Sequence, residues 1–437
     1  MKARVIGGGL AGSEAAWQLA QRGHDVSLYE MRPAVGTPAH KTEALAEVVC
    51  TNSFKSTDVT NAHGLLKAEL RILESLLLDI AERTRIPGGT ALVVDRKEFS
   101  RLVTESIENH PKVEVVRAEV SAIEPNTIVA TGPLTSDAMS HAISERLGTD
   151  SLAFFDAIAP IVSAESLDHE MLFAQSRYDK GDGADYLNAP LDEKRYNEFI
   201  DALISGDQFA GHDFDSVPYF EGCLPIEEMA SRGRDTLRFG PMKPVGLTDP
   251  RTGKRPYAVV QLRREDREGQ MWNLVGFQTR LRIPEQKRIF GTIPGFADVE
   301  YYRFGSIHRN TYLNSPAALS DHATLRDDSS VFFAGQLIGV EGYTESLASG
   351  LLAGINLARV LDGLEARVPP RETVLGALLH YVRSGDPARF QPMNANFGLL
   401  PPLDEPVRDK KLRKSRLAER ALARMEQFAV GLAAVAA

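Results

Sequence analysis

The chain has 437 residues with 50 Lys and Arg against 59 Asp and Glu, a formal charge of −9, and two cysteines. This length predicts two or three domains, while two cysteines exclude a disulfide framework and, with no His or Cys neighbours at ligand spacing, a zinc site. No run approaches the roughly 18 apolar residues of a membrane helix, and Met1 leads directly into a strand-like segment rather than an apolar leader. We therefore expect a cytoplasmic protein with no membrane partner and no metal.

The N-terminus predicts a dinucleotide-binding turn. Ala3–Ile6 is a predicted buried strand, Ser13–Gln21 a predicted helix, and His24–Tyr29 a second strand followed by Glu30. In a GxGxxG turn the glycines allow a sharp bend, a close approach of pyrophosphate and tight helix packing, while an acidic residue after the second strand binds ribose hydroxyls. The candidate cofactor residues here are Gly7, Gly8, Gly9, Leu10, Ala11, Gly12 and Glu30.

Two later segments repeat the arrangement of a strand that leads into a glycine turn. The strand 126–132 ends in Ala-Thr-Gly, and the strand 330–336 leads to a turn and then to a helix predicted from about Ser346 to Leu361. Backbone of this kind can hold cofactor phosphate. Three such elements favour FAD over NAD as the bound cofactor. The additional candidates are Thr131, Gly132, Gly335, Gln336 and Gly342.

The pattern changes between about Asp156 and Ile307, where aromatic residues interleave with charges and short strand-like runs occur at Tyr257–Leu262 and Trp272–Phe277. Cofactor elements flank this stretch on both sides, so we interpret it as an inserted domain. The predicted fold is α/β: a Rossmann-like FAD-binding domain, residues 1–160 and 308–437, interrupted by an α+β insertion domain, residues 161–307.

Each cysteine lies in a short, distinctive segment. Taken alone, Cys50 and Cys223 are more often inert buried thiols than catalytic groups. Their segments nevertheless belong to a set of motifs that closely resembles the folate- and FAD-dependent tRNA (uracil-5-)-methyltransferase family along essentially the whole chain. The motifs are Gly7–Gly12 with Tyr29–Pro33, Val49–Phe54, Gly64–Lys67, Pro87–Gly89, Val94–Arg96, Phe220–Pro225, Arg238–Leu247 and Phe390–Gly398.

The resemblance implies methylation at C5 of the T-loop uridine, position 54 of tRNA. It also implies 5,10-methylenetetrahydrofolate as carbon donor and NADPH or NADH as the source of electrons through FAD. Uracil C5 becomes nucleophilic once a thiolate adds to C6, and a base must later remove the C5 proton. We expect Cys223 to be the nucleophile and Cys50 the base or flavin-side partner, with the reverse assignment left open. Tyr343 resembles the aromatic residue that covers the flavin.

A tRNA partner requires positive surface. Residues 408–424 hold eight basic and two acidic residues, so this segment carries +6 and the remainder of the chain −15. The segment has a helical pattern with Leu412, Leu417, Leu422 and Met425 on its apolar positions. The RNA-binding candidates are Lys410, Lys411, Arg413 and Lys414, with Arg282 in the inserted domain. A solvated basic helix without a ligand is the alternative.

Other classes of function stay open at this point. The chain could be an FAD-dependent oxidoreductase of a small molecule, a flavoprotein that modifies another tRNA uridine, or a flavin-stabilised RNA-binding scaffold without catalysis. The folate contacts, the preference for NADPH or NADH and the oligomeric state are not specified by the sequence.

Overall fold

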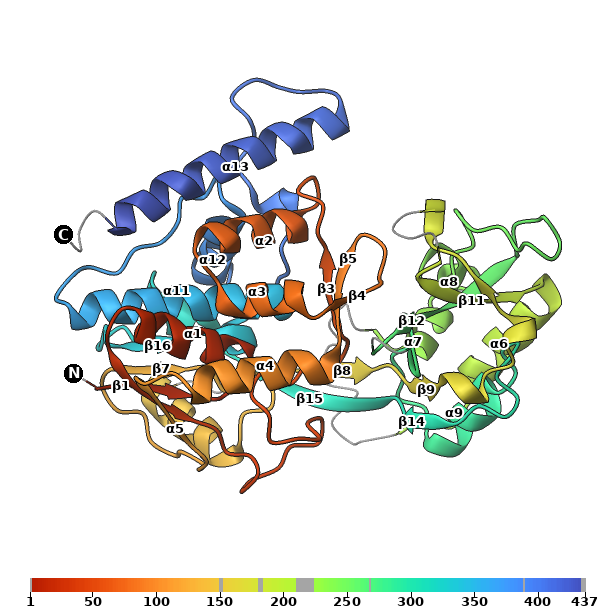
Figure 1. Cartoon of the computed structure of the whole chain (residues 1–437), viewed down its shortest axis with the longest axis horizontal. Coiled ribbons are helices and arrows are strands. Elements are labelled where there is room, and N and C mark those ends of the chain that lie inside the picture. The colour runs from red at the N-terminus through yellow and green to blue at the C-terminus, as the bar shows by residue number, and fades with distance from the viewer. Residues whose placement is uncertain are drawn as a thin grey trace.

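The computed structural model describes residues 2–148, 152–179, 184–209, 224–266, 269–387 and 390–433. For residues 152–158, 179, 306–310 and 433 it describes the backbone only. Figure 1 shows two bodies, one built from both ends of the chain and one from its middle third, coloured yellow to green. The predicted interruption of one domain by another is therefore visible in the chain path.

The first body is organised around a parallel sheet of five strands in the order β16-β7-β1-β2-β6. Its central strands are buried, with Val5, Leu28 and Ile128 fully inaccessible, as expected for a parallel sheet covered on both faces. The strands are β1 (Lys2–Ile6), β2 (Asp25–Tyr29), β6 (Val113–Val116), β7 (Thr127–Val129) and β16 (Val331–Phe333).

Two helices that are far apart in the sequence pack together on this sheet, α1 (Leu10–Gln21) and α11 (Tyr343–Leu361). Their backbones approach closely because α11 carries glycine where it crosses α1. A Cβ on Gly350 would lie 2.1 Å from the carbonyl oxygen of Ala11, and a Cβ on Gly354 would lie 2.6 Å from that of Ala15. This contact brings the N-terminal glycine turn and the second glycine turn to the same edge of the sheet.

The remaining elements of this body surround the sheet. Asp95 accepts hydrogen bonds from the amides of Lys97 and Glu98 and so caps α4 at Arg96. A small sheet is formed by β3 (Ser53–Ser56), β5 (Ala91–Val94) and β4 (Arg85–Ile86). The other helices are α2 (Ala62–Ile72), α3 (Leu76–Arg83), α4 (Arg96–Glu108), α5 (Asp137–Leu147), α10 (Ser315–Ala318), α12 (Val374–Ser384) and α13 (Lys410–Ala433), with 3₁₀ turns at Gly335–Ile338 and Phe397–Leu399.

The inserted domain is an α+β unit whose six-stranded sheet has the order β10-β11-β12-β13-β9-β14. Its core includes the fully buried Phe199, Phe277, Phe290 and Phe296. The strands are β9 (Ile161–Ser163), β10 (Phe173–Ala174), β11 (Tyr186–Leu191), β12 (Ala258–Arg264), β13 (Met271–Leu274) and β14 (Tyr301–Arg303). The helices are α6 (Glu193–Ser205), α7 (Ile226–Ser231), α8 (Thr236–Phe239) and α9 (Ile283–Phe290), with short 3₁₀ turns at Ala164–Ser166, His169–Met171 and Arg177–Asp179.

Two antiparallel strands connect the bodies, β8 (Leu152–Ile158) and β15 (Ser306–Tyr312). Along the chain, β8 is followed at once by β9, the first strand of the six-stranded sheet. The last strand of that sheet, β14, is followed at once by β15. The predicted fold class, a Rossmann-like domain interrupted by an α+β domain, is thus confirmed. Helix starts were placed late: α1 begins at Leu10 rather than Ser13, and α11 at Tyr343 rather than Ser346, because each glycine turn leads straight into its helix.

Candidate functional site

The turn between β1 and α1 is crowded at three of its four glycines and open at the other. A Cβ on Gly8 would lie 2.5 Å from the side chain of Leu45. A Cβ on Gly7, where φ is +104°, would lie 2.5 Å from the carbonyl oxygen of Ala130, and a Cβ on Gly12 would lie 1.8 Å from that of Gly7. By contrast, nothing lies within 4 Å of the Cβ position of Gly9. The backbone at the start of α1 therefore offers free space to a phosphate at a helix N-terminus.

A cavity opens beside this turn, at the carboxyl ends of the parallel strands where such folds bind ligands. Most of the predicted cofactor residues line it: Gly7, Gly9, Leu10, Ala11, Glu30, Thr131, Gly335, Gln336 and Tyr343. The others, Gly8, Gly12, Gly132 and Gly342, are their neighbours in the chain and are not among the lining residues. The cavity also has lining residues that sequence reasoning missed, among them Met31, Arg32, Thr37, His40, Glu47, Val49 and Ser346.

Glu30 stands at the end of β2 with its carboxylate held in place. One oxygen accepts from the amide of Gly8 at 3.0 Å, and the other accepts from Nε of Arg32 at 2.9 Å and from the Arg32 amide. Burial raises the pKa of Glu30, but the hydrogen bonds and charge of Arg32 outweigh it and lower the pKa overall. Glu30 is therefore an anionic acceptor at the point where a ribose would approach.

Tyr343 joins this cavity to the loop that carries Cys50. The phenol oxygen of Tyr343 accepts hydrogen bonds from the backbone amides of Cys50 at 2.8 Å and Thr51 at 3.2 Å. Burial raises the pKa of Tyr343, so the phenol is neutral. Val49, the residue before Cys50, itself lines the cavity. The predicted cofactor residues and one predicted catalytic cysteine are thus brought together.

Two arginines converge on the backbone around Cys50. Arg303 donates to the carbonyl oxygens of Val49 at 2.5 Å and Cys50 at 3.3 Å, and Arg96 donates to Val49 at 3.2 Å. Arg96 also forms an ion pair with the buried Glu265 at 2.6 Å. Burial and the neighbouring charge of Arg96 lower the pKa of Arg303 to about 10, which leaves it charged at neutral pH. Two cationic side chains therefore hold the backbone of Val49 and Cys50.

The inserted domain also contacts the loop that carries Cys50. Nε of Arg263 on β12 donates to the side chain of Asn52 at 3.2 Å, and the Asn52 amide donates to the carbonyl oxygens of Val94 and Arg264. Asn52 is completely buried between the two domains. The position of Cys50 therefore depends on contacts from both domains.

The second predicted catalytic residue, Cys223, lies outside the described residues. The description resumes at Leu224, which is buried, and the amide of Ile226 donates to the carbonyl oxygen of Gln278 at 2.7 Å. The helix α7 begins at Ile226, with Pro225 at its N-cap position. The segment after Cys223 is thus anchored in the core of the inserted domain.

The predicted RNA-binding residues fall in two places. Lys410, Lys411, Arg413 and Lys414 all lie exposed in the first turns of α13. That helix packs on the first body through Leu417, Ala418, Ala421 and Met425, whereas Leu412, expected on the apolar face, is 49% exposed because the helix starts beyond the body it packs on. Arg282 lies in the inserted domain and pairs with Asp207 at 3.2 Å.

The described part of the chain contains no cluster of three or more His, Cys, Asp or Glu side chains able to hold a metal ion. Among the described helices, none is both long and apolar enough to cross a membrane.

The parallel sheet, the glycine turn at β1, the acidic residue after β2 and the second glycine turn before α11 define a dinucleotide-binding α/β protein with an inserted domain. Residues 2–365 match the model of the family described as glucose inhibited division protein A. The chain belongs to that family. Its similarity to curated relatives also places it in the methylenetetrahydrofolate–tRNA-(uracil-5-)-methyltransferase family.

Relatives of that second family match the chain over nearly its whole length. The methylenetetrahydrofolate–tRNA-(uracil-5-)-methyltransferase of Geobacter sulfurreducens is 55% identical over 426 residues, covering 97% of this chain and 98% of the relative. That of Dictyoglomus turgidum is 55% identical over 428 residues, covering 97% of each chain. Among solved structures, GidA of Aquifex aeolicus superposes with a TM-score of 0.71 at 17% identity, over 99% of this chain and 76% of that one, and shows the same fold.

Proposed function

We propose that this protein methylates C5 of uridine in tRNA, at the T-loop position 54, with 5,10-methylenetetrahydrofolate as carbon donor. The observation that carries the proposal is the hydrogen bond between Tyr343 and the amide of Cys50, which ties a dinucleotide cavity to a thiol. Relatives at 55% identity are named for this reaction, and the match extends over both domains. The cytoplasm, where tRNA is processed, is the compartment we propose.

FAD is the cofactor that we assign to the cavity. The open backbone at Gly9 fits its pyrophosphate, Glu30 fits its ribose, and the turn at Gly335 and Gln336 fits its ring end beside Tyr343. When bound and reduced by NADPH or NADH, FAD supplies the hydride that completes the methyl group. The chain itself has to position the uridine, activate it and remove a proton.

In the proposed reaction, the thiolate of Cys223 adds to C6 of uracil, and the ring electrons then make C5 nucleophilic toward the methylene carbon of the folate. Cys50 removes the proton from C5, the bond between the transferred carbon and the folate nitrogen breaks so that tetrahydrofolate leaves, and a methylene group remains on C5. Hydride delivered to that methylene carbon completes the methyl group, and the C6–sulfur bond breaks to release the Cys223 thiolate. Arg96 and Arg303 bind the backbone carbonyls of Val49 and Cys50 and so help to fix the backbone that carries the Cys50 thiol. Hydrogen bonds of Tyr343 and Asn52 hold the loop that carries Cys50 beside the cavity.

One labelling experiment separates this function from its rivals. Purified protein is incubated with a tRNA transcript, NADPH, FAD and 5,10-methylenetetrahydrofolate that carries a labelled methylene carbon, and the digested tRNA is analysed for labelled 5-methyluridine. Label in that nucleoside supports the proposal. Label from S-adenosylmethionine instead, or NADPH oxidation with tRNA left unmodified, would contradict it.

A further inference from the structure

A second cationic segment occurs in the inserted domain, apart from α13. Residues 232–255 contain seven basic and two acidic residues, so they carry +5 in a chain whose total is −9. Three of the arginines form ion pairs, Arg234 with Asp201, Arg238 with Asp235 and Arg251 with Asp249. Lys243, Lys254 and Arg255 are exposed, and no ion pair joins them to another residue in the part of the chain that the structure describes.

Two aromatic side chains are exposed to solvent here, one within this segment and one in a turn that contacts it. Phe239, the last residue of α8, is 80% exposed, and Tyr178 is 62% exposed. Aromatic rings surrounded by lysine and arginine are the usual platform for stacking the bases of unpaired RNA.

Tyr178 is fixed to the cationic segment by its backbone and its neighbour. The Tyr178 amide donates to the carbonyl oxygen of Gly246 at 2.9 Å, and a Cβ on Gly246 would lie 3.1 Å from the ring atoms of Tyr178. The guanidinium of Arg177 donates to the carbonyl oxygens of Lys243 and, at 3.0 Å, Val245. Tyr178 has a φ of +58°, which costs a non-glycine residue on the order of 1 kcal/mol. The ring of Tyr178 is therefore held at a fixed place beside the cationic segment.

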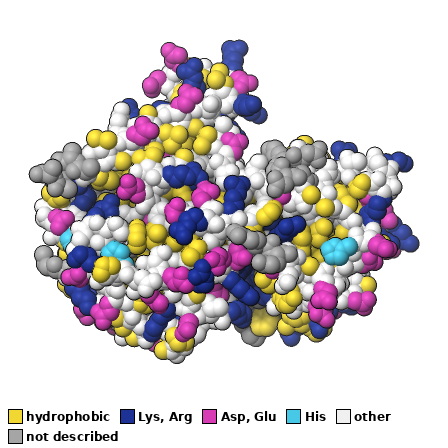
Figure 2. All heavy atoms as spheres, in the orientation of Figure 1, with side chains coloured by type: hydrophobic (Ala, Val, Ile, Leu, Met, Phe, Trp, Pro, Cys, Tyr) yellow, Lys and Arg dark blue, Asp and Glu magenta, His cyan; other side chains and the backbone are white. Residues whose placement is uncertain are grey.

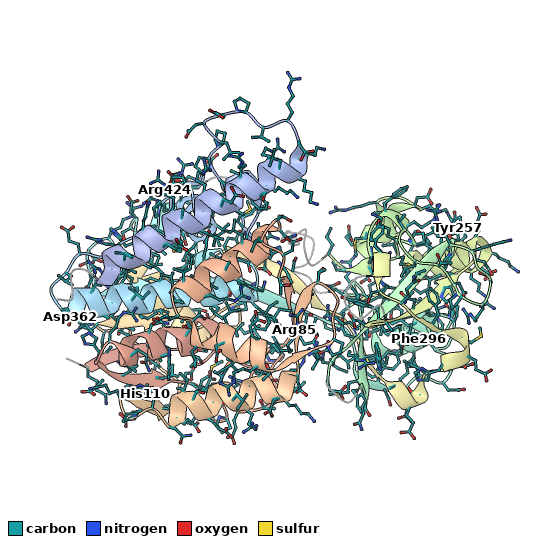
Figure 3. The ribbon with its side chains drawn as sticks, turned by 45° about the horizontal axis from the view of Figure 1, so that its top comes forward. Arg85, His110, Tyr257, Phe296, Asp362 and Arg424 are labelled. Atoms are coloured by element: carbon teal, nitrogen blue, oxygen red, sulfur yellow. The ribbon has the colours of Figure 1, made fainter. Side chains whose placement is uncertain are left out.

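The segment lies in the body next to the one that carries the basic end of α13. In Figure 1, the first turns of α13 project at the top of the first body, as they do in the space-filling view of Figure 2, and α8 lies in the upper half of the inserted domain. Figure 3, tilted by 45°, keeps Tyr257, whose ring is covered by Arg238 at 3.6 Å, and Arg424 of α13 at the upper edge.

We propose that Tyr178, Phe239, Lys243, Lys254 and Arg255 form a second RNA-contact surface, called here the Phe239 surface. The lysines and Arg255 neutralise phosphates, and Phe239 stacks on an unpaired base of the tRNA whose other side rests on α13. The proposal rests on the proposed function for its ligand, tRNA. The excess of positive charge favours RNA over a protein partner as the occupant.

The first test measures tRNA affinity over a salt series for the full-length protein. Replacing Lys243, Lys254 and Arg255 together by alanine should weaken binding at least tenfold at low salt and lower the slope of log K against log salt by about two, at roughly 0.7 per lost contact. The matched control is Lys194→Ala on α6, whose side chain is 86% exposed. Parallel curves for the triple variant and the wild-type protein would overturn the proposal and leave a protein partner as the alternative occupant.

The second test addresses stacking. Phe239→Ala should weaken tRNA binding about tenfold, as expected for loss of one base–aromatic stack, and Phe239→Trp should restore it and show tRNA-dependent quenching of its fluorescence. Ile204→Ala, which removes a 48% exposed apolar side chain from α6, is the control and should bind normally. Normal tRNA binding by Phe239→Ala, or no quenching of Phe239→Trp, would contradict the proposal.

The same samples distinguish failure of this surface from failure of the proposed function. If the wild-type protein forms 5-methyluridine while the Phe239 surface variants bind tRNA normally, the surface is wrong and the function stands. If these variants lose tRNA binding while the wild-type protein transfers no methylene carbon, the surface stands and the function is wrong. Thermal unfolding of each variant should match the wild-type protein, because all the replaced side chains are exposed.

Discussion

The phenol oxygen of Tyr343 lies 2.8 Å from the backbone nitrogen of Cys50, although the two residues are 293 positions apart in the chain. Tyr343 opens α11 at the second glycine turn, and Cys50 lies on a loop that the inserted domain also contacts through Asn52. The side chain of Tyr343 therefore lines the cofactor cavity and also holds the loop of a predicted catalytic residue, Cys50. We treat Tyr343 as a residue that positions Cys50 as well as one that lines the cavity.

Removing only the hydroxyl of Tyr343 should separate these two roles. Tyr343→Phe keeps the ring but leaves the amides of Cys50 and Thr51 without their acceptor, which costs about 1–3 kcal/mol if they remain buried. We expect FAD to be retained and the rate of tRNA methylation to fall about tenfold, measured as kcat at saturating tRNA. Tyr381→Phe, whose hydroxyl bonds to Gln391, serves as the control and should be fully active. A normal kcat for Tyr343→Phe would remove the positioning role.

The open and crowded glycines of the first turn predict opposite outcomes. Gly12→Ala places a Cβ 1.8 Å from the carbonyl oxygen of Gly7, so it should lower the stability of the cofactor-free protein by several kcal/mol. Gly9→Ala meets no protein atom within 4 Å. We expect Gly9→Ala to unfold like the wild-type apoprotein but to bind FAD at least tenfold more weakly, measured by flavin fluorescence. Normal FAD binding by Gly9→Ala would place the pyrophosphate elsewhere.

The roles of the two cysteines can be assigned by trapping. A tRNA containing 5-fluorouridine cannot lose a C5 proton, so the covalent bond between the enzyme and C6 should persist in a denaturing gel. We expect the adduct in the wild-type protein and in Cys50→Ala, and its absence in Cys223→Ala. An adduct that survives Cys223→Ala and disappears in Cys50→Ala would reverse our assignment.

Local sequence signals predicted the cofactor end of this site, and contacts between distant segments determined the rest. The spacing of Gly7, Gly9, Gly12 and Glu30 follows from a single strand–turn–helix unit, so it can be recognised without the fold. The arginines around Cys50 come from α4 and from β14 of the inserted domain. Nothing in the sequence near Arg303 distinguishes it from the other basic residues of the chain.

The same limit explains why the Phe239 surface was not predicted. The net charge of the whole chain is −9, so it does not reveal a local excess of positive charge. A phenylalanine in a sequence also indicates burial more often than exposure. Only the structure shows that Phe239 is 80% exposed at the end of a four-residue helix. The error at Leu412 has the same origin, since helical spacing predicts a face but not where the supporting body ends.

Glu345 should make the stability of the protein depend on acidic pH. Its carboxylate is buried and accepts from His63 at 3.0 Å and from the amide of Ala395 at 3.0 Å. Burial raises its pKa, but His63 and the charge of Lys55 outweigh this and lower it from 4.5 to about 2. The shift is equivalent to about 3 kcal/mol of stability, fully present above pH 4.5 and lost as the pH falls through 2.

Glu345→Gln should therefore lower the free energy of unfolding by about 2–3 kcal/mol at pH 7, and the difference from the wild-type protein should narrow as the pH approaches 3. Urea unfolding at pH 7, 5 and 3 measures this. Glu419→Gln, at an exposed position of α13, should leave the stability unchanged at each pH. A difference that stays constant from pH 7 to pH 3 would show that Glu345 contributes by packing rather than by charge.

The basic end of α13 provides the last prediction. Replacing Lys410, Lys411, Arg413 and Lys414 by alanine removes four exposed charges and should weaken tRNA binding strongly while lowering the salt slope by about three. The fold should be unaffected, because α13 is anchored by side chains from Leu417 onward. Leu412→Ala, on the same turns but uncharged, controls for the shape of the surface. Unchanged binding by the quadruple variant across the salt series would make α13 a solvated helix with no RNA contact.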